Sequence, residues 1–323
     1  MAVALKWDVA RTGEGALHRV RPVARGVTRP TIGPLRRRRA SGPSVGLLLV
    51  GAIVIVAVLG PLLVPSSPAA QDLVNRLQPP IGFGGTTAHP LGTDALGRDL
   101  LARAVMGARL SLAIGLAATV GAGLIGIALG LIAGYSRGIV DRLVTWMIDV
   151  QMAIPFVVVA IAIAAALRPG MATVLATLVL TAWVGYARVV RLQTHSLRAA
   201  PWVEAARSLG VGRMWLLARH LLPNLVGPIL VIASQQVAAM VLYEAALSYL
   251  GLGVGGNTIT WGGMIADGQE TLTTAWWVSL VPGAALALMI LAWNLLGDAA
   301  ATGRYHWSSN RRMTRSDIKE TNA

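Results

Sequence analysis

Two residue types are almost missing from this chain of 323 residues. It contains no cysteine, so it has no disulfide framework, no thiolate metal site and no cysteine nucleophile, and its redox compartment stays undetermined. Lysine occurs only at Lys6 and Lys319. A P-loop needs a lysine directly after its glycine-rich turn, and neither lysine has that context. The chain therefore cannot hold ATP by a Walker-type site.

Charged residues are also scarce, at 13%, whereas hydrophobic residues make up 55% and glycine adds another 36 residues. In ordinary soluble domains the apolar share is about 45 to 50% with glycine included. The chain also lacks an HExxH motif, a GxSxG motif and a pair of catalytic carboxylates, so no catalytic residue is predicted. This composition favours a polytopic membrane protein over a soluble protein of two domains.

Six apolar stretches are long enough to cross a bilayer as helices, which takes about 20 residues each. They cover residues 45–64, 109–134, 143–167, 172–190, 225–250 and 277–297. The fourth is the least apolar, because it contains Trp183, Gly185 and Tyr186. The sequence therefore predicts an all-α polytopic membrane protein with six transmembrane helices.

Positive charge is distributed unevenly between the connections. The N-terminal tail, the 135–142 loop, the 188–223 segment and the tail from residue 299 hold ten, two, six and five Arg or Lys residues, whereas 66–108, 168–171 and 251–276 hold three, one and none. Connections with more Arg and Lys stay in the cytoplasm. We therefore expect both termini and the 188–223 segment to be cytoplasmic, and the net charge of +14 to act in topology rather than in nucleic-acid binding.

The first 44 residues are rich in Arg, Pro and Gly and end in RRRRASGP. A secretory signal has an apolar region of about 7 to 15 residues, whereas residues 45–64 can span the membrane uninterrupted. This length favours an uncleaved anchor, despite the small residues of SSPAAQ that follow. We expect the arginine run to orient the chain and to contact anionic lipid.

The second predicted span carries a small-residue stripe, in which small residues recur every four positions. Its members are Ala118, Ala122, Gly126, Gly130 and Gly134. Such stripes let the backbones of two helices approach closely within lipid. Packing within the subunit is favoured, and a helix of a partner subunit is the alternative.

The segment HPLGTDALGRDLLARAVMGARL precedes that span. Its apolar spacing predicts a helix along the outer interface that leads into the span. His89, Asp94 and Asp99 are too scattered to predict a metal site. Thr93 or Asp94 is instead expected to be the N-cap of the helix.

Four polar side chains within the spans are candidates for a path through the membrane. Asp149 lies two turns into its span, ahead of Pro155, which can kink the helix. Glu244 lies about 28 Å along its own span, near the outer end. For both, the alternative is a structural partner such as an arginine or a backbone amide. Gln235 and Gln236 could line a pore or form interhelical hydrogen bonds.

The cytoplasmic segment VEAARSLGVGRMWLLARHLLPN is too charged to cross a bilayer and too apolar to be a simple linker. If the first part of the segment is a helix, Val203, Ala206 and Leu209 lie on one side of it. Glu204 and Arg207 then have the spacing of an exposed ion pair. Glycines at 210 and 212 break this helix.

A second helix is expected from Arg213 to Leu222, ended by Pro223. Its predicted apolar face consists of Trp215, Leu216, Leu217 and Leu221. Two short amphipathic helices could dock into a groove of another protein or lie on lipid, and the residues favour neither alternative.

The order of EAA, then Gly210, then a terminal Leu-Pro resembles the EAA loop of ABC importer permeases. Further segments resemble, in order, those of the dipeptide/oligopeptide-type permeases, specifically the C-type subunit. They are HPLGTDALGRD, AGYSRGIVDRL, DVQMAIPF, LYEAALSYLGLG, TWGGMIADG, AWW and NLLGD, and they cover about residues 89–298. The chain departs from the family at its end, where AAATGRYHWSSN replaces the usual xLRDxLDP tail.

The resemblance implies a type I ABC importer permease core preceded by an extra N-terminal helix. Its parts would be a cytoplasmic tail at 1–44, an anchor at 45–65, an extracytoplasmic segment at 66–108, a five-helix core at 109–298 with its coupling loop at 191–223, and a cytoplasmic tail at 299–323. Within that loop, the contact with the ATPase would involve Glu204, Ala205, Ala206, Arg207, Leu209 and Gly210.

The resemblance also implies a non-catalytic subunit of the bacterial plasma membrane. Its partners would be a paralogous B-type permease, two ABC ATPases and an extracytoplasmic solute-binding protein, besides membrane lipid. The imported solutes would be di- or oligopeptides, with nickel chelates or another small solute as the alternative. The chain itself is expected to bind no cofactor, because ATP and Mg belong to the ATPase subunits.

Overall fold

The computed structural model describes residues 42–64, 67–136, 138–255 and 258–320, and it places side chains for residues 45–301 within these ranges. The arginine-rich tail at 1–41 lies outside the described residues. The helices are α1 (Gly42–Leu63), α2 (Leu100–Tyr135), α3 (Ile139–Ala153), α4 (Phe156–Ala166), α5 (Met171–Arg198), α6 (Pro201–Ser208), α7 (Arg213–Leu216), α8 (Leu222–Tyr249), α9 (Trp261–Asp267) and α10 (Trp277–Glu320). Short turns of 3₁₀-helix cover Leu73–Asn75 and Gln269–Thr271.

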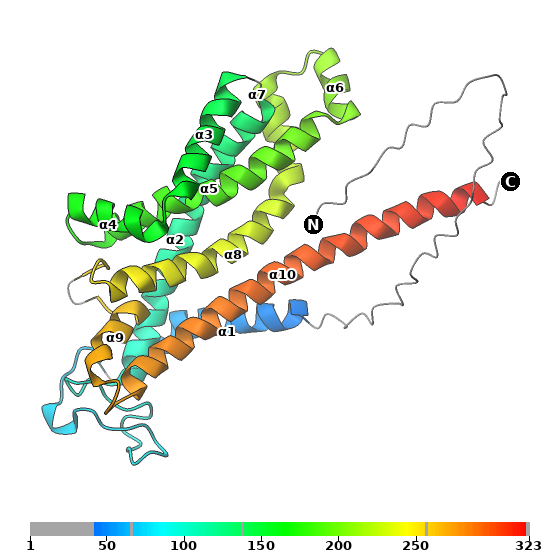
Figure 1. The fold of residues 1–323 in the computed structure, drawn as a ribbon. Coiled ribbons are helices and arrows are strands. Elements are labelled where there is room, and N and C mark those ends of the chain that lie inside the picture. Colours follow the sequence, from blue (N-terminus) through cyan, green and yellow to red (C-terminus); the bar gives the residue numbers. More distant parts are fainter. Residues whose placement is uncertain (1–41, 65–66, 137, 256–257, 321–323) are drawn as a thin grey trace, which may run out of the picture. The chain divides into compact units, whose positions relative to one another are not determined.

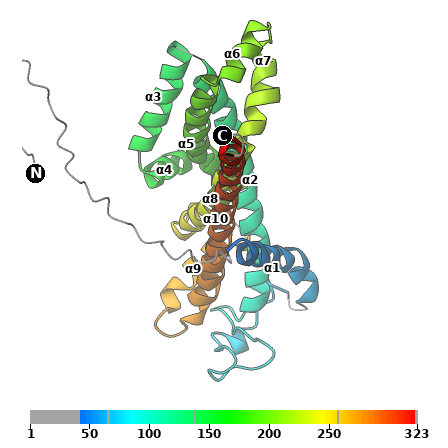
Figure 2. The ribbon, with the colours of Figure 1, turned by 90° about the vertical axis from the view of Figure 1, so that its right-hand side faces the viewer.

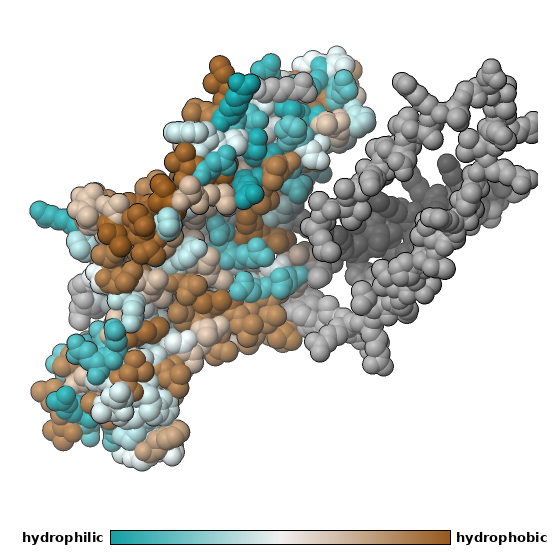
Figure 3. Space-filling view, in the orientation of Figure 1, coloured by the Kyte–Doolittle hydropathy of each residue, from teal (hydrophilic) through white to brown (hydrophobic). Residues whose placement is uncertain are grey.

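Five of these helices are long and apolar enough to cross a membrane, namely α1, α2, α5, the helix that ends in α8, and α10. Figure 1 shows their arrangement, and Figure 2 shows α3 and α4 on one side of α2, α8 and α10, with α1 on the other. In Figure 3, apolar residues gather over the middle of the molecule and hydrophilic ones toward the end that carries α6. The architecture confirms the prediction of an all-α membrane protein.

The third predicted span is not one straight helix. α3 and α4 together are apolar enough to cross, but they are bent by 93° at their junction. The break falls at Ile154, whose backbone is extended (φ −97°, ψ 122°) directly before Pro155. Proline disfavours the helical conformation in the residue that precedes it. The expected kink is therefore a full break, and α4 continues in a new direction.

The helix before the second span begins later than the sequence predicts. Asp99, and neither Thr93 nor Asp94, is the N-cap, and its carboxylate accepts a hydrogen bond from the backbone N–H of Ala102. Asp94 instead accepts from the backbone N–H groups of Leu96 and Arg98, which closes a tight turn. From Leu100 onward, α2 is one continuous helix of 36 residues rather than an interfacial helix followed by a span.

α2 and α5 form the closest helix pair, through the small-residue stripe of α2. Ala118 and Ala122 are completely buried. A Cβ added at any of the three glycines of the stripe would collide with backbone oxygens of α5, which belong to Trp183, Ala187 and Arg191. The guanidinium of Arg198, at the end of α5, donates to the carbonyl of Tyr135 at the end of α2. The structure thus confirms that the stripe packs within the subunit.

Glycines also bring α1 against its neighbours. A Cβ at Gly46 would lie 2.7 Å from the backbone nitrogen of Leu296 in α10, and one at Gly60 would meet the side chain of Val105 in α2. The other faces of α1 expose large apolar side chains, including Leu48 at 72% and Leu62 at 82%. An apolar helix exposed in this way suits contact with lipid acyl chains.

Candidate functional site

α6 is the short helix that the sequence predicts to lie in the cytoplasm and to carry the EAA contact, and its ends are defined by Pro201 and Gly210. Proline is favoured in the first turn, where its missing N–H costs no hydrogen bond. At the other end, Gly210 has a φ of +80°, its N–H donates to the Arg207 carbonyl, and the N–H of Val211 donates to the Ala206 carbonyl. These two bonds form a Schellman motif, which requires the left-handed conformation that glycine adopts readily. The predicted break at Gly210 is confirmed.

One face of α6 is anchored inside the subunit. Val203 is completely buried, and Ala206 is half-buried. Val203 belongs to an apolar cluster that joins α2, α5, α7 and α8, whose other members are Leu131, Tyr135, Val190, Leu216, Leu217, Leu221 and Leu225. The cluster holds α6 against the ends of the long helices.

The opposite face of α6 points away from the apolar cluster. Glu204, Ala205 and Ser208 are exposed. Leu209 is 84% exposed, although the sequence predicts it on the side of Val203. Leu209 follows Val203 by six residues, which places it about 120° around the helix from that side chain at 3.6 residues per turn. The helix thus presents outward a mixed surface, with the polar Glu204 and Ser208 beside the apolar Ala205 and Leu209.

Arg207 does not lie where the sequence predicts. It is expected to pair with Glu204, but its guanidinium carbon lies over the ring of Tyr135, 5.2 Å from the ring centroid. Positions 203 and 207 share one face of a helix because they are four residues apart. Arg207 therefore faces α2 together with Val203, and Glu204 faces away.

The second predicted helix does not end at Pro223. α7 continues through a π-helical turn, Leu217–Leu221, into α8, so that Arg213–Tyr249 is helical throughout. A proline clashes with the carbonyl four residues before it in a regular α-helix, and the wider π turn relieves this clash. Leu216, Leu217 and Leu221 are buried as predicted, whereas Trp215 is 53% exposed and its ring packs on His220.

The two candidate glutamines of α8 have different surroundings. Gln235 is exposed. Gln236 lines a cavity of about 430 Å³ between α3, α4, α5 and α8, and its side-chain amide donates to the carbonyl of Ala182 at 3.1 Å. Gln151 lines the same cavity and was missed by the sequence reasoning. Its amide donates to the Leu180 carbonyl at 2.6 Å, and its Oε1 accepts from the Trp183 indole at 2.8 Å.

Asp149 is exposed on α3, beside a second cavity of about 520 Å³ that Arg188 and Arg191 also line. Arg191 itself forms an ion pair with Asp141, with 2.6 Å between Nε and Oδ1. The carboxylate of Asp149 thus lies near positive charge, which the sequence reasoning gave as its structural alternative. Its exposure also leaves it accessible from the cavity.

Glu244 is completely buried, at the end of α8 remote from α6. Its carboxylate accepts hydrogen bonds from Ser248 at 2.8 Å and from Ser111 of α2 at 3.2 Å. Thr260 donates to Ser248, and the backbone N–H of Trp261 donates to Ser111. Glu244 thus joins α2, α8 and the start of α9, and this arrangement favours the structural alternative over contact with a solute.

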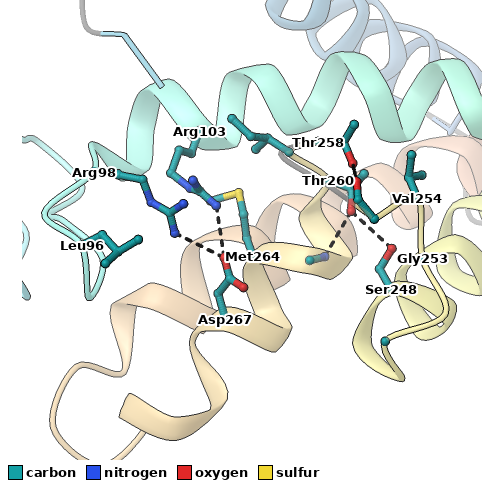
Figure 4. Close-up of a pocket in the computed structure, with 14 residues that line it drawn as sticks. Leu96, Arg98, Arg103, Ser248, Gly253, Val254, Thr258, Thr260, Met264 and Asp267 are labelled. Atoms are coloured by element: carbon teal, nitrogen blue, oxygen red, sulfur yellow. Dashed lines mark hydrogen bonds and ion pairs between the residues drawn. The ribbon is translucent and has the colours of Figure 1, made fainter. Parts of the chain in front are cut away.

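A pocket of about 400 Å³ lies next to this network (Figure 4), at the opposite end of α2 from α6. Arg98 and Arg103 both point at the carboxylate of Asp267 in α9, with N–O distances of 3.4 and 3.2 Å. The buried Asp94 accepts from Nε of Arg98 at 2.6 Å. Asp94 and Asp267 thus balance the charges of Arg98 and Arg103, and the ion pairs of Asp267 link the start of α2 to α9.

Comparisons with known proteins show which family this chain belongs to. Residues 126–303, more than half of the chain, match the family described as "Binding-protein-dependent transport system inner membrane component". The chain belongs to this family. Residues 38–80 match a second family, the "N-terminal TM domain of oligopeptide transport permease C", and α1 lies within that stretch. The resemblance derived from the motifs is therefore confirmed, including the extra N-terminal helix of this permease.

Relatives of this permease cover most of its length. It is 37% identical to the dipeptide transport system permease protein DppC of Alkalihalophilus pseudofirmus over 254 residues, which is 79% of this chain and 82% of that protein. It is 38% identical to the di/tripeptide transport system permease protein DppC of Pseudomonas aeruginosa over 254 residues, covering 78% and 84%. It is therefore a multi-pass inner-membrane permease subunit of an ABC importer.

A solved structure shows the same fold. A chain of the MetNI methionine ABC transporter, in an inward facing conformation, aligns with 61% of this permease and 96% of its own length, with a TM-score of 0.50 and 19% sequence identity. At this identity the likeness concerns the fold alone. It confirms the type I importer permease core predicted from the sequence.

Sequence reasoning missed three contacts of this permease for different reasons. Gln151 had a usable signal, because it is a polar residue within an apolar run two positions after Asp149. Tyr135 had no signal in the sequence, because its ring contacts Arg207 only once α6 has packed beside α2. The ion pairs of Asp267 join residues more than 160 positions apart in the sequence, a distance across which no local pattern exists.

Proposed function

We propose that this permease forms half of the translocation path of an ATP-driven importer of di- and oligopeptides. A paralogous B-type permease would supply the other half, two ABC ATPases the energy, and an extracytoplasmic solute-binding protein the solute. Relatives named for dipeptide and di/tripeptide transport, which align with more than three quarters of the chain, support the substrate class. ATP and Mg would be bound by the ATPases, and this chain would bind no cofactor.

The outward surface of α6 is the observation that carries the proposal. The leucines of the predicted apolar face, Leu216, Leu217 and Leu221, are buried inside the subunit, so that of this face only Trp215 remains exposed to a membrane surface. Outward, the helix presents Glu204, Ala205 and the exposed Leu209. A short helix of this kind fits a groove on another protein. We assign the ATPase contact to this face, with Ala206 and Arg207 on the side of α2.

The orientation follows from the same assignment. α6 would lie in the cytoplasm, where the ATPases are, together with both termini, in agreement with the arginine distribution. The pocket around Arg98 and Asp267 would then face the extracytoplasmic side and the binding protein. Among the polar side chains that line the two cavities, Gln236, Gln151 and Asp149 are the candidates for the path, whereas Gln235 would contact the path only in the assembled transporter.

Co-purification with tagged ATPase subunits tests the coupling assignment. Glu204→Arg reverses the charge of the outward face, and Gly210→Pro removes the positive φ on which the Schellman motif depends. Both variants should lose the ATPases while remaining folded in detergent. The matched control is Glu270→Arg, the same charge change at an exposed residue near α9. Unchanged ATPase capture by both variants would remove the proposal.

Uptake in a strain that lacks this transporter tests the substrate class. A panel of defined di-, tri- and hexapeptides is compared with a nickel chelate, each with and without the ATPase genes. We expect peptide uptake that requires the ATPases. Uptake of the nickel chelate alone would support the alternative solute, and uptake without the ATPases would indicate a self-sufficient transporter.

A further inference from the structure

A contact between the side chains of Arg207 and Tyr135 connects the proposed coupling helix α6 with α2, a continuous span of 36 residues. Tyr135 is the last residue of α2, and it is only 7% exposed. The Arg207 guanidinium lies over its ring at 5.2 Å, within the distance at which a cation is attracted to the electron-rich face of an aromatic ring. Arg207 thus contacts α2 through a directional interaction, in addition to the apolar contact of Val203.

The geometry of α6 explains why such an interaction matters. A helix of 8 residues has two turns, and Val203 is its completely buried side chain. Val203 and Ala206 together make an apolar contact with the cluster, and such a contact holds a helix against a surface but fixes its rotation only weakly, because apolar attraction has no preferred direction. A second contact one turn further along, at Arg207, removes this freedom.

Tyr135 uses its ring face and not its hydroxyl in this arrangement. Its Oη atom is buried, and it has no hydrogen-bond partner among the described residues. The end of α2 is in turn fixed to α5, because Arg198 donates to the carbonyls of Tyr135 and Ser136 at 2.9 and 3.0 Å. The ring over which Arg207 lies therefore belongs to a firmly held backbone.

We infer that Tyr135 and Arg207 form a positioning pair that sets the orientation of the coupling helix on α2. The pair fixes the direction in which Glu204, Ala205 and Leu209 point. Arg207 thus acts within this subunit rather than as a contact of the ATPase. The inference rests on the proposed coupling function of α6, but it can be tested without the ATPases.

The absence of cysteine makes a direct test possible. Ser208→Cys introduces a single thiol on the exposed face of α6, and a nitroxide attached to it reports the mobility of the helix in the full-length chain in lipid nanodiscs. In this background, Tyr135→Leu removes the ring but keeps an apolar side chain, and Arg207→Gln removes the cation. Tyr135→Phe is the matched control, because it removes only the unpartnered hydroxyl.

Tyr135→Leu and Arg207→Gln should each raise the ratio of mobile to immobile nitroxide by roughly two- to fivefold, the effect expected of an exposed cation–π contact. Tyr135→Phe should leave the spectrum unchanged, and the double variant should be no more mobile than the looser single variant. An unchanged spectrum in Tyr135→Leu and Arg207→Gln, or equal mobility in Tyr135→Phe and Tyr135→Leu, would overturn the inference.

The ATPase co-purification described above separates this inference from the function on which it rests. If Glu204→Arg loses the ATPases while Tyr135→Leu leaves the nitroxide immobile, the positioning pair is wrong and the coupling assignment stands. If Tyr135→Leu loosens α6 while Glu204→Arg retains the ATPases, the pair exists but α6 is not the coupling helix. Because Arg207 is exposed, Arg207→Gln remains informative even if Tyr135→Leu fails to fold.

Discussion

The α2–α5 interface and the attachment of α6 to the core are built in opposite ways. Along the α2–α5 interface, the backbones approach so closely that three successive glycines of the small-residue stripe leave no room for a Cβ. α6 instead contacts the core through the buried Val203, the half-buried Ala206 and an arginine that lies over a ring. The first arrangement makes two spans move as one unit. The second leaves most of a short helix available to a partner.

The largest effect is expected at the centre of the α2–α5 interface. Gly126→Leu places a side chain against the backbone of Trp183 and Ala187, and overpacking of this kind costs about 3 kcal/mol of unfolding free energy when the backbone itself must move. Thermal unfolding in detergent, followed by tryptophan fluorescence, should show a clear loss of stability. Gly51→Leu in α1 is the control, because a Cβ at Gly51 meets no atom within 4 Å. Equal melting of the two variants would show that the interface is looser than described.

A smaller and local effect is expected at the buried side of α6. Val203→Ala removes two methyl groups from the apolar cluster, which costs about 2 kcal/mol with the cavity included. The loss should detach α6 without unfolding α2 and α5. Amide hydrogen exchange should therefore accelerate in 201–208 and stay slow in the spans. Ala205→Ser, a change on the exposed face, should have no such effect, and faster exchange throughout both helices would contradict the separation of the two regions.

The smallest effect on stability is expected at the outward tip of α6. Leu209 is 84% exposed, so Leu209→Ala should change the unfolding free energy by less than about 0.5 kcal/mol. The same change should weaken ATPase capture, because an exposed leucine beside Glu204 is suited to fill a groove on a partner. Titration of the ATPase against the immobilised permease would measure the affinity. A loss of stability without a loss of affinity would reverse the roles assigned to Leu209 and Val203.

The sequence was sufficient for the features that depend on local composition. Apolar length alone located the spans, and the glycine spacing of α2 predicted its packing face. Pro155 indicates that the helix breaks between α3 and α4. It does not indicate the angle of 93° between them, because a proline restricts only the conformation of the residue before it. The direction of α4 depends on contacts such as the stacking of Phe156 on Tyr243, whose ring centroids are 4.2 Å apart.

The errors came from positions where distant segments decide the local structure. Thr93, Asp94 and Asp99 are all acceptable N-caps by residue type, but Asp94 closes the turn before the helix, and this turn is held by the distant Asp72, whose backbone N–H donates to the Leu96 carbonyl. Pro223 was expected to end a helix, yet a π turn accommodates it while the neighbouring leucines are buried in the cluster around Val203. Candidate path residues were identified by polarity, which cannot distinguish a buried network such as that of Glu244 from a cavity lining.

The length of α2 has a consequence for how the protein responds to its membrane. The helix is continuous from Leu100 to Tyr135 and contains no proline, so Arg103 and Tyr135 are separated by about 48 Å at 1.5 Å per residue. The hydrocarbon layer is only about 30 Å thick. A thicker or thinner bilayer can tilt this helix or shift the headgroups along it, but it leaves the spacing between the two ends unchanged. α2 thus keeps the Asp267 ion pairs at one end and the Tyr135 ring that contacts α6 at the other end at a fixed separation in any lipid.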